Sequence, residues 1–424
     1  MAYFKKTDVN IADYTPSAQP YVSQNSTVRI SPVTSKFEGR FSYGQNNEFW
    51  EVAYSQNAVK TYLEHELGVS ISTTNTAPGS GYYHISKPIF FYQPDTVITG
   101  STAVLLETDP GTLKFWGFGS WKFNDIRDGF LLENYEGTIQ FVKFSSASGS
   151  VVKTVHTRSQ WKDPMDGAGP SKLNLDFNKI QMAEIEYSWY GAGSAVLSFK
   201  YEGKLYIADV FVGANTGTLP LVGNPNLSMM YGVKIVGTAS EAPVLKHWGV
   251  AVTIDGERQS ISRKASVSNP LVKTNATSST WVPILSIRLK GNFSVDSGFS
   301  KSNLYGYINQ LLANCSVLDP LSWKTFALIT DPTLVGANYQ PVPNGSGNAE
   351  VSIVEYDSTA TSLSGGRIVS QLNTNSNITL SALRADTISL SSMSVSPVIT
   401  IAARHLTGTT AAPISCSFTW EEVY

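Results

Sequence analysis

Two glutamates spaced two residues apart form one pair of side chains that could do chemistry together. Glu184 and Glu186 lie in the run from Gln181 to Tyr190, which reads as a strand. Because side chains of a strand alternate between its faces, both carboxylates are expected on one face. Most glycosidases use two carboxyl groups about 5 to 10 Å apart. Carboxylates sharing a solvated sheet face are far commoner than catalytic pairs, and we expect that simpler arrangement here.

Three aspartates near two glycines could instead supply oxygen ligands to calcium. Asp163, Asp166 and Asp176 lie close together in the sequence, and hard cations prefer several oxygens on a tight turn. The spacing does not match a calcium-binding Dx[DN]x[DN]G loop, and Asp163 precedes a proline. Asp and Gly are ordinary turn residues, so we expect a structural turn and no metal.

Other catalytic patterns are missing from the sequence. The five histidines are scattered, and the chain has no HExxH or Cys/His cluster. It also lacks a GxSxG elbow and the glycine patterns of nucleotide-binding loops. We therefore predict that the chain is not an enzyme and binds no cofactor.

Composition excludes further classes of protein. Lys+Arg number 31 and Asp+Glu 33, giving a net charge of −2, and no basic stripe is visible. We expect no nucleic-acid partner, because such proteins carry a positive footprint. No run of eighteen apolar residues exists, so we expect no membrane insertion. The two cysteines, Cys315 and Cys416, are expected to be reduced and buried.

The elements that position these residues are short strands separated by Gly, Pro and Asn turns. Glu202-Gly203 predicts a compact hairpin between two alternating runs. Residues 59–71 alternate and read as one strand, and Leu304, Ile308, Leu311 and Leu312 could make one short helix. The pattern predicts an all-β protein with a jelly-roll or lectin-like β-sandwich and a second, C-terminal β-sandwich domain.

We expect four segments along the 424 residues. Residues 1–35 read as an extended N-terminal arm, because they are polar and proline-containing without sustained periodicity. Residues 36–256 form the jelly-roll-like sandwich and residues 281–424 the C-terminal β-domain. Residues 257–280 are rich in Ser, Lys and Asn and poor in apolar residues, which is typical of a linker.

A polar loop between two aromatic-rich strands is the candidate surface for a ligand or for assembly. It runs from Gln160 to Ser171, and its composition is typical of a rigid, shaped loop. The residues that we single out in it are Trp161, Asp163, Asp166, Gly167, Gly169 and Pro170. Tryptophans could stack on sugars, although most tryptophans of a sandwich belong to the core or to subunit contacts. The candidates for such stacking are Trp116, Trp121, Trp161, Trp189 and Trp248.

Several motifs resemble those of a family of virion proteins, found chiefly in tailed bacteriophages and sometimes in large DNA viruses. The likeness covers most of the chain from about residue 45, and the Trp-containing loop is its most specific element. The matching segments are Phe90 to Pro94, Gly129-Phe-Leu, the loop from Gln160 to Ser171, Trp189 to Gly193, Pro283 to Arg288, Asp331 to Gly336, Val354 to Ser358, Ser364 to Gly366 and Trp420-Glu-Glu. Asp95 stands where the family usually has Gly.

The resemblance implies a non-enzymatic virion structural protein, either a capsid decoration or minor capsid protein or a tail-associated component. We expect it in the virion as a homo-oligomer such as a trimer, in contact with major capsid or tail proteins. The alternative is a receptor- or glycan-binding fibre or adhesin that recognises a host surface glycan. A third hypothesis is a polysaccharide hydrolase that uses Glu184 or Asp166.

Overall fold

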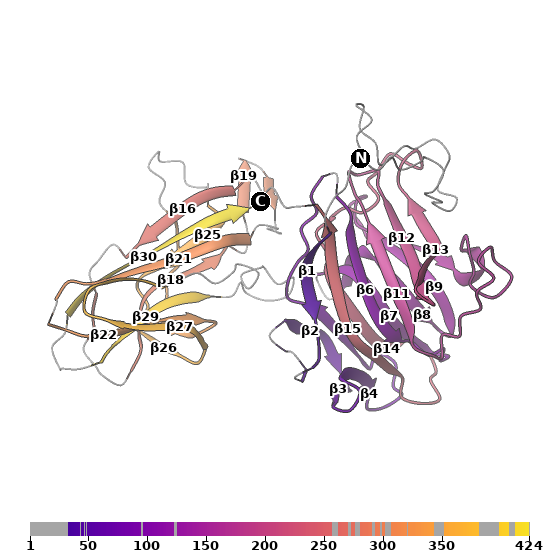
Figure 1. Ribbon diagram of the computed structural model, residues 1–424, viewed down its shortest axis with the longest axis horizontal. Helices are drawn as coiled ribbons and strands as arrows, with labels where there is room; N and C mark the ends of the chain where they lie inside the picture. Colours follow the sequence, from indigo (N-terminus) through magenta and orange to yellow (C-terminus); the bar gives the residue numbers. More distant parts are fainter. Residues whose placement is uncertain are drawn as a thin grey trace, which may run out of the picture.

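The chain folds into two β-sandwiches, each with its own hydrophobic core (Figure 1). The predicted all-β class, with a jelly-roll-like sandwich and a second C-terminal sandwich, is confirmed. The predicted arm lies outside the described residues up to position 32. The computed structural model describes residues 33–42, 44, 45, 47, 49–94, 96–122, 125–256, 262–269, 273–275, 280–290, 293–296, 299–301, 307–319, 321–342, 352–380, 398–406 and 412–423.

The N-terminal sandwich consists of two antiparallel sheets. The eight-stranded sheet has the order β13 (Lys204–Val212), β12 (Ser194–Tyr201), β11 (Gln181–Tyr187), β6 (Ile98–Leu105), β15 (Val244–Asp255), β4 (Gly68–Thr73) and β3 (Ala58–Leu63), with β1 (Val33–Gly39) paired to β15. The seven-stranded sheet has the order β10 (Val152–Thr157), β9 (Thr138–Ser145), β8 (Asp125–Tyr135), β7 (Thr112–Lys122), β14 (Ser228–Ile235), β5 (Gly81–Ser86) and β2 (Trp50–Gln56). Figure 1 shows the two sheets as two layers.

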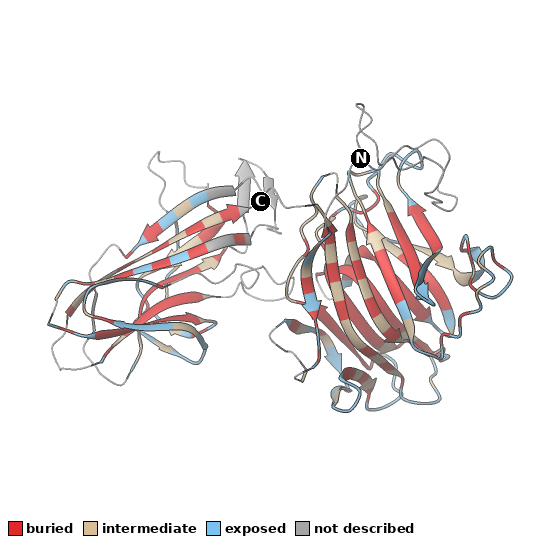
Figure 2. Ribbon diagram, viewed as in Figure 1, coloured by how far each residue is buried: buried red, intermediate tan, exposed pale blue. Residues whose placement is uncertain are grey.

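Alternating side chains hold the two layers together. Buried and half-buried residues alternate strictly along β6, and Figure 2 shows the same banding along β15. The inward residues of both sheets form one core, in which Ile185 and Leu197 of one sheet join Phe118 and Phe130 of the other. Burying such side chains stabilises the fold by about 1.5 to 3 kcal/mol each. The same alternation fixes which residues of β11 face outward.

One hairpin turn, at Glu202-Gly203, is predicted by its residue types, and another, between β3 and β4, is not. Glu202 and Gly203 have φ of 48° and 77°, as a two-residue hairpin turn requires, which confirms the predicted hairpin. The single strand predicted for residues 59–71 is wrong, because the chain reverses between β3 and β4. Leu67 adopts a φ of 51° in that turn, a conformation that leucine rarely takes and the sequence does not announce.

The C-terminal sandwich pairs a five-stranded with a six-stranded sheet. The first has the order β16 (Ser262–Ser268), β30 (Ala412–Val423), β21 (Tyr307–Val317) and β28 (Asn377–Leu380), with β17 (Lys273–Asn275) on β30. The second has the order β24 (Gln340–Pro341), β25 (Val354–Asp357), β18 (Val282–Leu289), β29 (Ile399–His405), β22 (Lys324–Thr330) and β27 (Arg367–Thr374). Two two-stranded sheets complete it. One is the hairpin of β19 (Phe293–Asp296) with β20 (Phe299–Lys301), and the other pairs β23 (Thr333–Val335) with β26 (Ser362–Ser364), which β24 and β25 separate in the sequence.

Two sequence expectations differ from this second sandwich. Strands β16 and β17 lie inside the segment predicted as a linker, and Val267 of β16 is part of the core. The helix proposed around Ile308 to Leu312 is wrong, because these residues belong to β21. Leu311 and Ala313, two residues apart, both face the core. Buried residues at every second position are typical of a strand and not of a helix. In the described part of the chain, no helix is long and apolar enough to span a membrane.

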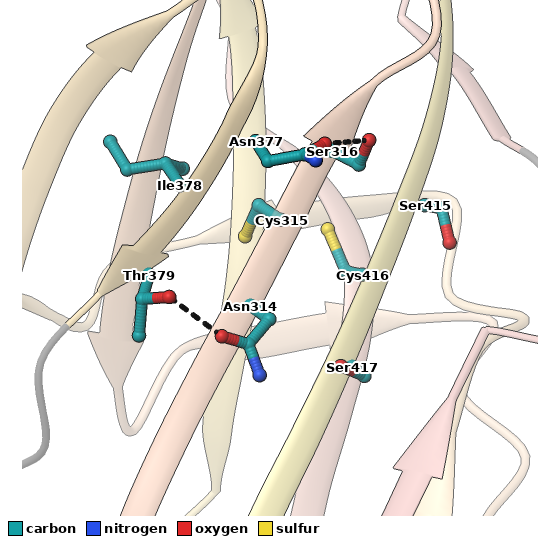
Figure 3. A pocket seen from close by; sticks show the side chains of 9 residues that line it. All are labelled: Asn314, Cys315, Ser316, Asn377, Ile378, Thr379, Ser415, Cys416 and Ser417. Atoms are coloured by element: carbon teal, nitrogen blue, oxygen red, sulfur yellow. Dashed lines mark hydrogen bonds between the residues drawn. The ribbon is translucent and has the colours of Figure 1, made fainter.

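The two cysteines face each other across adjacent strands. Cys315 of β21 and Cys416 of β30 are paired in register, and both are buried free thiols in the core (Figure 3). Cys315 and Cys416 line a polar hollow of about 480 Å³ together with neighbouring residues of β21, β28 and β30 (Figure 3). Its side chains are hydrogen-bonded to one another, as between Thr379 Oγ1 and Asn314 Oδ1 at 2.8 Å.

Both thiols are expected to resist alkylation in the native protein. Burial and the neighbouring Cys315 raise the pKa of Cys416, and the thiolate is the reactive form. Iodoacetamide should label neither cysteine in native buffer and both in guanidinium chloride, as measured by mass spectrometry. Labelling of either residue in the folded chain, or a disulfide in the unlabelled one, would contradict this assignment.

Candidate functional site

The outer face of the eight-stranded sheet carries the Glu184–Glu186 pair in its central part. On β11, Ala183, Ile185 and Tyr187 are buried in the core. The glutamates between them therefore point to the opposite face of the sheet. The expectation that both carboxylates share one face is thus confirmed, but the face is not solvated at Glu184, which is buried.

Short polar side chains flank the two glutamates on β6, whereas on β12 the neighbours are Ser198 beside Glu184 and the apolar Val196 beside Glu186. Glu184 is paired in register with Ser101 of β6 and Ser198 of β12. Glu186 is paired with Thr99 of β6 on one side. Same-face neighbours in a sheet lie about 5 Å apart, so these hydroxyls flank the carboxylates. Glu184 and Ser198 are buried, whereas Glu186, Ser101 and Thr99 are partly exposed.

The two carboxylates have different electrostatic surroundings. Lys200 of β12 places its Nζ 2.8 Å from Glu184 Oε2. Glu186 has no hydrogen-bond or ion-pair partner among the described residues. Burial raises the pKa of Glu186, and the negative charges of Glu184 and Asp255 raise it further. One carboxylate is therefore held by a cation, while the other has an increased affinity for a proton.

Three aromatic rings lie beyond the C-terminal end of β11. Trp189 packs edge-on against Tyr92 with ring centroids 5.9 Å apart, and its Nε1 donates to Val222 O at 2.9 Å. Tyr190 is 64% exposed, and its backbone N–H donates to Tyr92 Oη at 3.2 Å. Partly exposed rings of this kind offer flat apolar surfaces beside polar groups, as sugar-binding sites do.

The tryptophans proposed for sugar stacking fall into two groups. Trp116, Trp121 and Trp161 are buried and cannot stack on a ligand in this fold. Trp161 lies in the core, and its Nε1 donates to a backbone carbonyl at 3.0 Å. Trp189 and Trp248 are half-buried. Of the five tryptophans, Trp189 is the one that follows the glutamates closely in the sequence.

The loop from Gln160 to Ser171 is closed by a buried carboxylate. Asp163 accepts hydrogen bonds from the backbone N–H groups of Met165 at 3.1 Å and Ser171 at 2.8 Å. Gly169 is packed against it, since a Cβ there would lie 2.1 Å from Asp163 Oδ1. Asp163 and Gly169 are therefore needed to hold the loop in its shape.

The outer tip of the loop is exposed. Asp166, Gly167 and Pro170 face solvent, and Asp166 Oδ1 accepts the N–H of Ala168 at 2.9 Å. Asp176 likewise accepts the N–H of a residue two positions on, at 3.0 Å. Within the described residues, no group of three His, Cys, Asp or Glu side chains could hold a metal ion. A ligand or assembly role for this tip stays a prediction.

Removing the closing carboxylate should destabilise the N-terminal sandwich. Asp163→Ala leaves two backbone N–H groups of a buried loop without an acceptor, at about 1 to 3 kcal/mol each. Asp166→Ala, in the same loop, removes one exposed bond and should cost less than about 1 kcal/mol. Urea unfolding followed by fluorescence measures both variants. Equal losses for the two would contradict the closing role of Asp163.

A histidine–carboxylate pair at the sandwich edge is a second arrangement that the sequence did not predict. His156 Nδ1 lies 2.6 Å from Asp209 Oδ2, and Asp209 is buried while His156 is partly exposed. A buried carboxylate that orients a histidine is one part of a nucleophilic triad. In the described chain no Ser, Thr or Cys side chain is hydrogen-bonded to this imidazole, so the pair lacks a nucleophile.

Comparisons with known proteins give structural neighbours of low similarity. No protein-family model matches the chain, and no curated protein matches it in sequence. A glycosyl hydrolase family protein from Mycobacterium fortuitum aligns with 11% identity and a TM-score of 0.35, covering 52% of this chain and 99% of its own. An endo-beta-1,3-glucanase from Pyrococcus furiosus aligns with 11% identity and a TM-score of 0.35, covering 53% of this chain and 96% of its own. A legume lectin-like domain from Entamoeba histolytica aligns with 9% identity and a TM-score of 0.31, covering 51% of this chain and 95% of its own.

This finding contradicts the prediction of a non-enzymatic virion structural protein, together with its alternative as a virion adhesin. The neighbours include glycan-cleaving enzymes, so the prediction that the chain is not an enzyme is corrected as well. Because the TM-scores lie below 0.5, we take no substrate or mechanism from these proteins. The resemblance to virion proteins, the virion location, the homo-oligomeric state and the virion or glycan partners stay predictions.

Proposed function

We propose that the N-terminal sandwich cleaves polysaccharide chains on the outer face of its eight-stranded sheet. The observation that carries this proposal is the unequal pair Glu184 and Glu186 on β11, one bound to Lys200 and the other with a raised pKa. A carboxyl group with a raised pKa next to a carboxylate bound by a cation is the pattern of an acid and its carboxylate partner.

The spacing of the pair supports the same chemistry. Same-face residues of a strand are about 6.6 Å apart, and glycosidase carboxyl groups are about 5 to 9.5 Å apart. Glu186, as the acid, donates its proton to the glycosidic oxygen as the bond to the anomeric carbon breaks. Glu184, as the carboxylate, stabilises the positive charge that develops on the sugar. Water then adds to the anomeric carbon, its proton returns to a carboxylate, and two shorter chains result.

The surroundings of the pair suit a sugar chain. The partly exposed hydroxyls of Ser101 and Thr99 lie beside the carboxylates and can exchange hydrogen bonds with sugar hydroxyls. Tyr190, 64% exposed, offers a ring just beyond the end of the same strand. Lys200 fixes Glu184 and leaves Glu186 free of protein partners within the described chain. These features favour a neutral polysaccharide over a charged one at the cleavage point.

Depolymerisation by the full-length chain tests this proposal. A panel of α- and β-linked glucans, galactans, xylans and mannans would be incubated with wild-type protein. New reducing ends and shortened chains are expected for at least one polymer, and Glu186→Gln should release them about 10² to 10⁴-fold more slowly. Binding of a polymer without any new reducing ends would contradict cleavage and leave only recognition. Equal release by both proteins would contradict the role of Glu186 as the acid.

A further inference from the structure

A separate hollow lies where the edge strands of the two N-terminal sheets meet. It has a volume of about 290 Å³ and lies between β9 and β10 of one sheet and the loop that follows β13 of the other. Five of its lining residues carry hydroxyl groups, namely Ser145, Ser148, Thr154, Thr216 and Thr218. None of the lining residues is a carboxylate.

A buried carboxylate outside the lining holds the two walls in place. Asp128 Oδ1 accepts the backbone N–H of Ser146 at 2.8 Å and that of Gly223 at 2.7 Å. Its second oxygen accepts the Ser146 hydroxyl at 2.6 Å. Ser146 belongs to one wall segment and Gly223 follows the other. The hollow is therefore fixed in shape before any ligand arrives.

Lys143 is the one charged residue among the lining residues. Its side chain is half-buried, and its Nζ lies 5.8 Å from the centre of the Phe211 ring. No carboxylate of the described residues lies within ion-pair distance of this ammonium. Burial lowers the pKa of Lys143, which is the cost of keeping a cation there without a counter-charge. The hydroxyls of Thr154 and Thr218 likewise make no hydrogen bond within the described chain.

We propose that this hollow binds a small anionic group, a sulfate, phosphate or carboxylate, through the ammonium of Lys143 and the hydroxyls of Thr154 and Thr218. Charge-assisted hydrogen bonds to such groups are the strong ones in proteins. The site uses neither Glu184 nor Glu186 and does not depend on polysaccharide cleavage. The simpler alternative is that the lysine stem only covers Phe211. In that case its charge has no ligand.

The two sites share one structural element. Leu221, which lines the hollow, donates its N–H to Gly191 O at 2.8 Å, next to the exposed Tyr190. Trp189 donates to Val222 of the same loop. A free ion or an acidic sugar could therefore supply the anion, and the experiment has to separate these two sources.

Calorimetric titration of the full-length protein at constant ionic strength tests the proposal. The probes are inorganic sulfate, inorganic phosphate and glucuronate. Wild type is expected to bind at least one of them saturably, and Lys143→Met to lose at least about tenfold in affinity, since a charge-assisted hydrogen bond is worth more than about 1.4 kcal/mol. Lys143→Arg and the exposed control Lys204→Met should bind as wild type does. If glucuronate binds more tightly than either inorganic ion, the ligand of the hollow is an acidic sugar. If sulfate or phosphate binds more tightly than glucuronate, the ligand is a free ion.

A second variant covers the case in which Lys143→Met fails to fold. Leu219 lines the hollow and is 57% exposed, so Leu219→Glu should fold and should repel the anion at least as strongly as the loss of Lys143 does. Glu186→Gln should bind the anion as wild type does, which separates this site from the proposed cleavage site. No saturable binding of any probe by wild type, or unchanged binding by the Lys143→Met and Leu219→Glu variants, would overturn the proposal.

Discussion

Replacing Glu186 with glutamine is expected to lower polysaccharide cleavage by about 10² to 10⁴-fold, the usual contribution of a general acid. An amide has the size of the carboxylic acid but cannot donate an acidic proton to the leaving oxygen. The kcat for release of reducing ends measures the effect, and circular dichroism checks the fold. Met182→Gln is the matched control, because Met182 lies on the same face of β11 and is 54% exposed. A loss of less than threefold in Glu186→Gln would contradict its role as the acid.

The pH dependence gives an independent test of the same residue. Glu186 acts in its protonated form, so activity should fall as the pH rises through its pKa. The charge of Asp255 helps to raise that pKa. Asp255→Asn removes this charge, lowers the pKa of Glu186 and should shift the fall in activity to lower pH. A shift to higher pH, or no shift, would show that another group titrates.

Acid should destabilise the N-terminal sandwich through two buried histidines. Burial lowers the pKa of His247 to about 3 and holds that of His84 well below its usual value. Both imidazoles are packed among aromatic rings, with the centroids of His247 and Tyr231 3.6 Å apart and those of His84 and Trp50 5.1 Å apart. His84 also lies 2.5 Å from Tyr231 Oη and 3.3 Å from Lys60 Nζ. A proton on either ring would therefore add a buried charge, which for His84 would lie beside the Lys60 ammonium.

The sign of the effect follows from proton binding. An unfolded histidine takes up a proton below about pH 6.5, whereas folded His247 stays neutral until about pH 3. In that window the unfolded chain binds more protons, so the free energy of unfolding falls as the pH falls, by up to about 1.4 kcal/mol per pH unit for each such histidine. Denaturant unfolding at several pH values measures this slope.

His247→Phe should flatten the slope by about one histidine's share, up to about 1.4 kcal/mol per pH unit. His65→Gln is the control, since His65 lies in the exposed turn between β3 and β4 and should leave the slope unchanged. An equal slope in His247→Phe and wild type would mean that this imidazole is not held neutral by burial.

Local patterns in the sequence predict the fold class well. Alternation places the inward and outward residues of strands such as β6, and Glu202-Gly203 marks its hairpin. The shared face of Glu184 and Glu186 follows from the same period of two. The prediction of one strand over residues 59–71 failed at the turn that ends with Leu67. There an unusual backbone conformation interrupts an alternating pattern that is continuous in the sequence.

The electrostatics of the candidate site could not be read from the sequence. Lys200 could have been found, because the turn at Gly191 to Gly193 sets the pairing of β11 with β12. Asp255 and Tyr92 come from strands and loops far away in the chain, and only the sheet order brings them near. The burial of Trp161 has the same origin, since its core partners include Phe199 on another strand. Long-range packing, and not local composition, decides which polar residues share a site.

The position of a bound oligosaccharide tests the central claim most directly. A structure of the Glu186→Gln variant with a fragment of the polymer that wild type cleaves would show where the chain lies. We expect sugars across the outer face of β6, β11 and β12, with a glycosidic oxygen within hydrogen-bonding distance of residue 186. A fragment bound elsewhere on the protein, with this face empty, would contradict the proposed site.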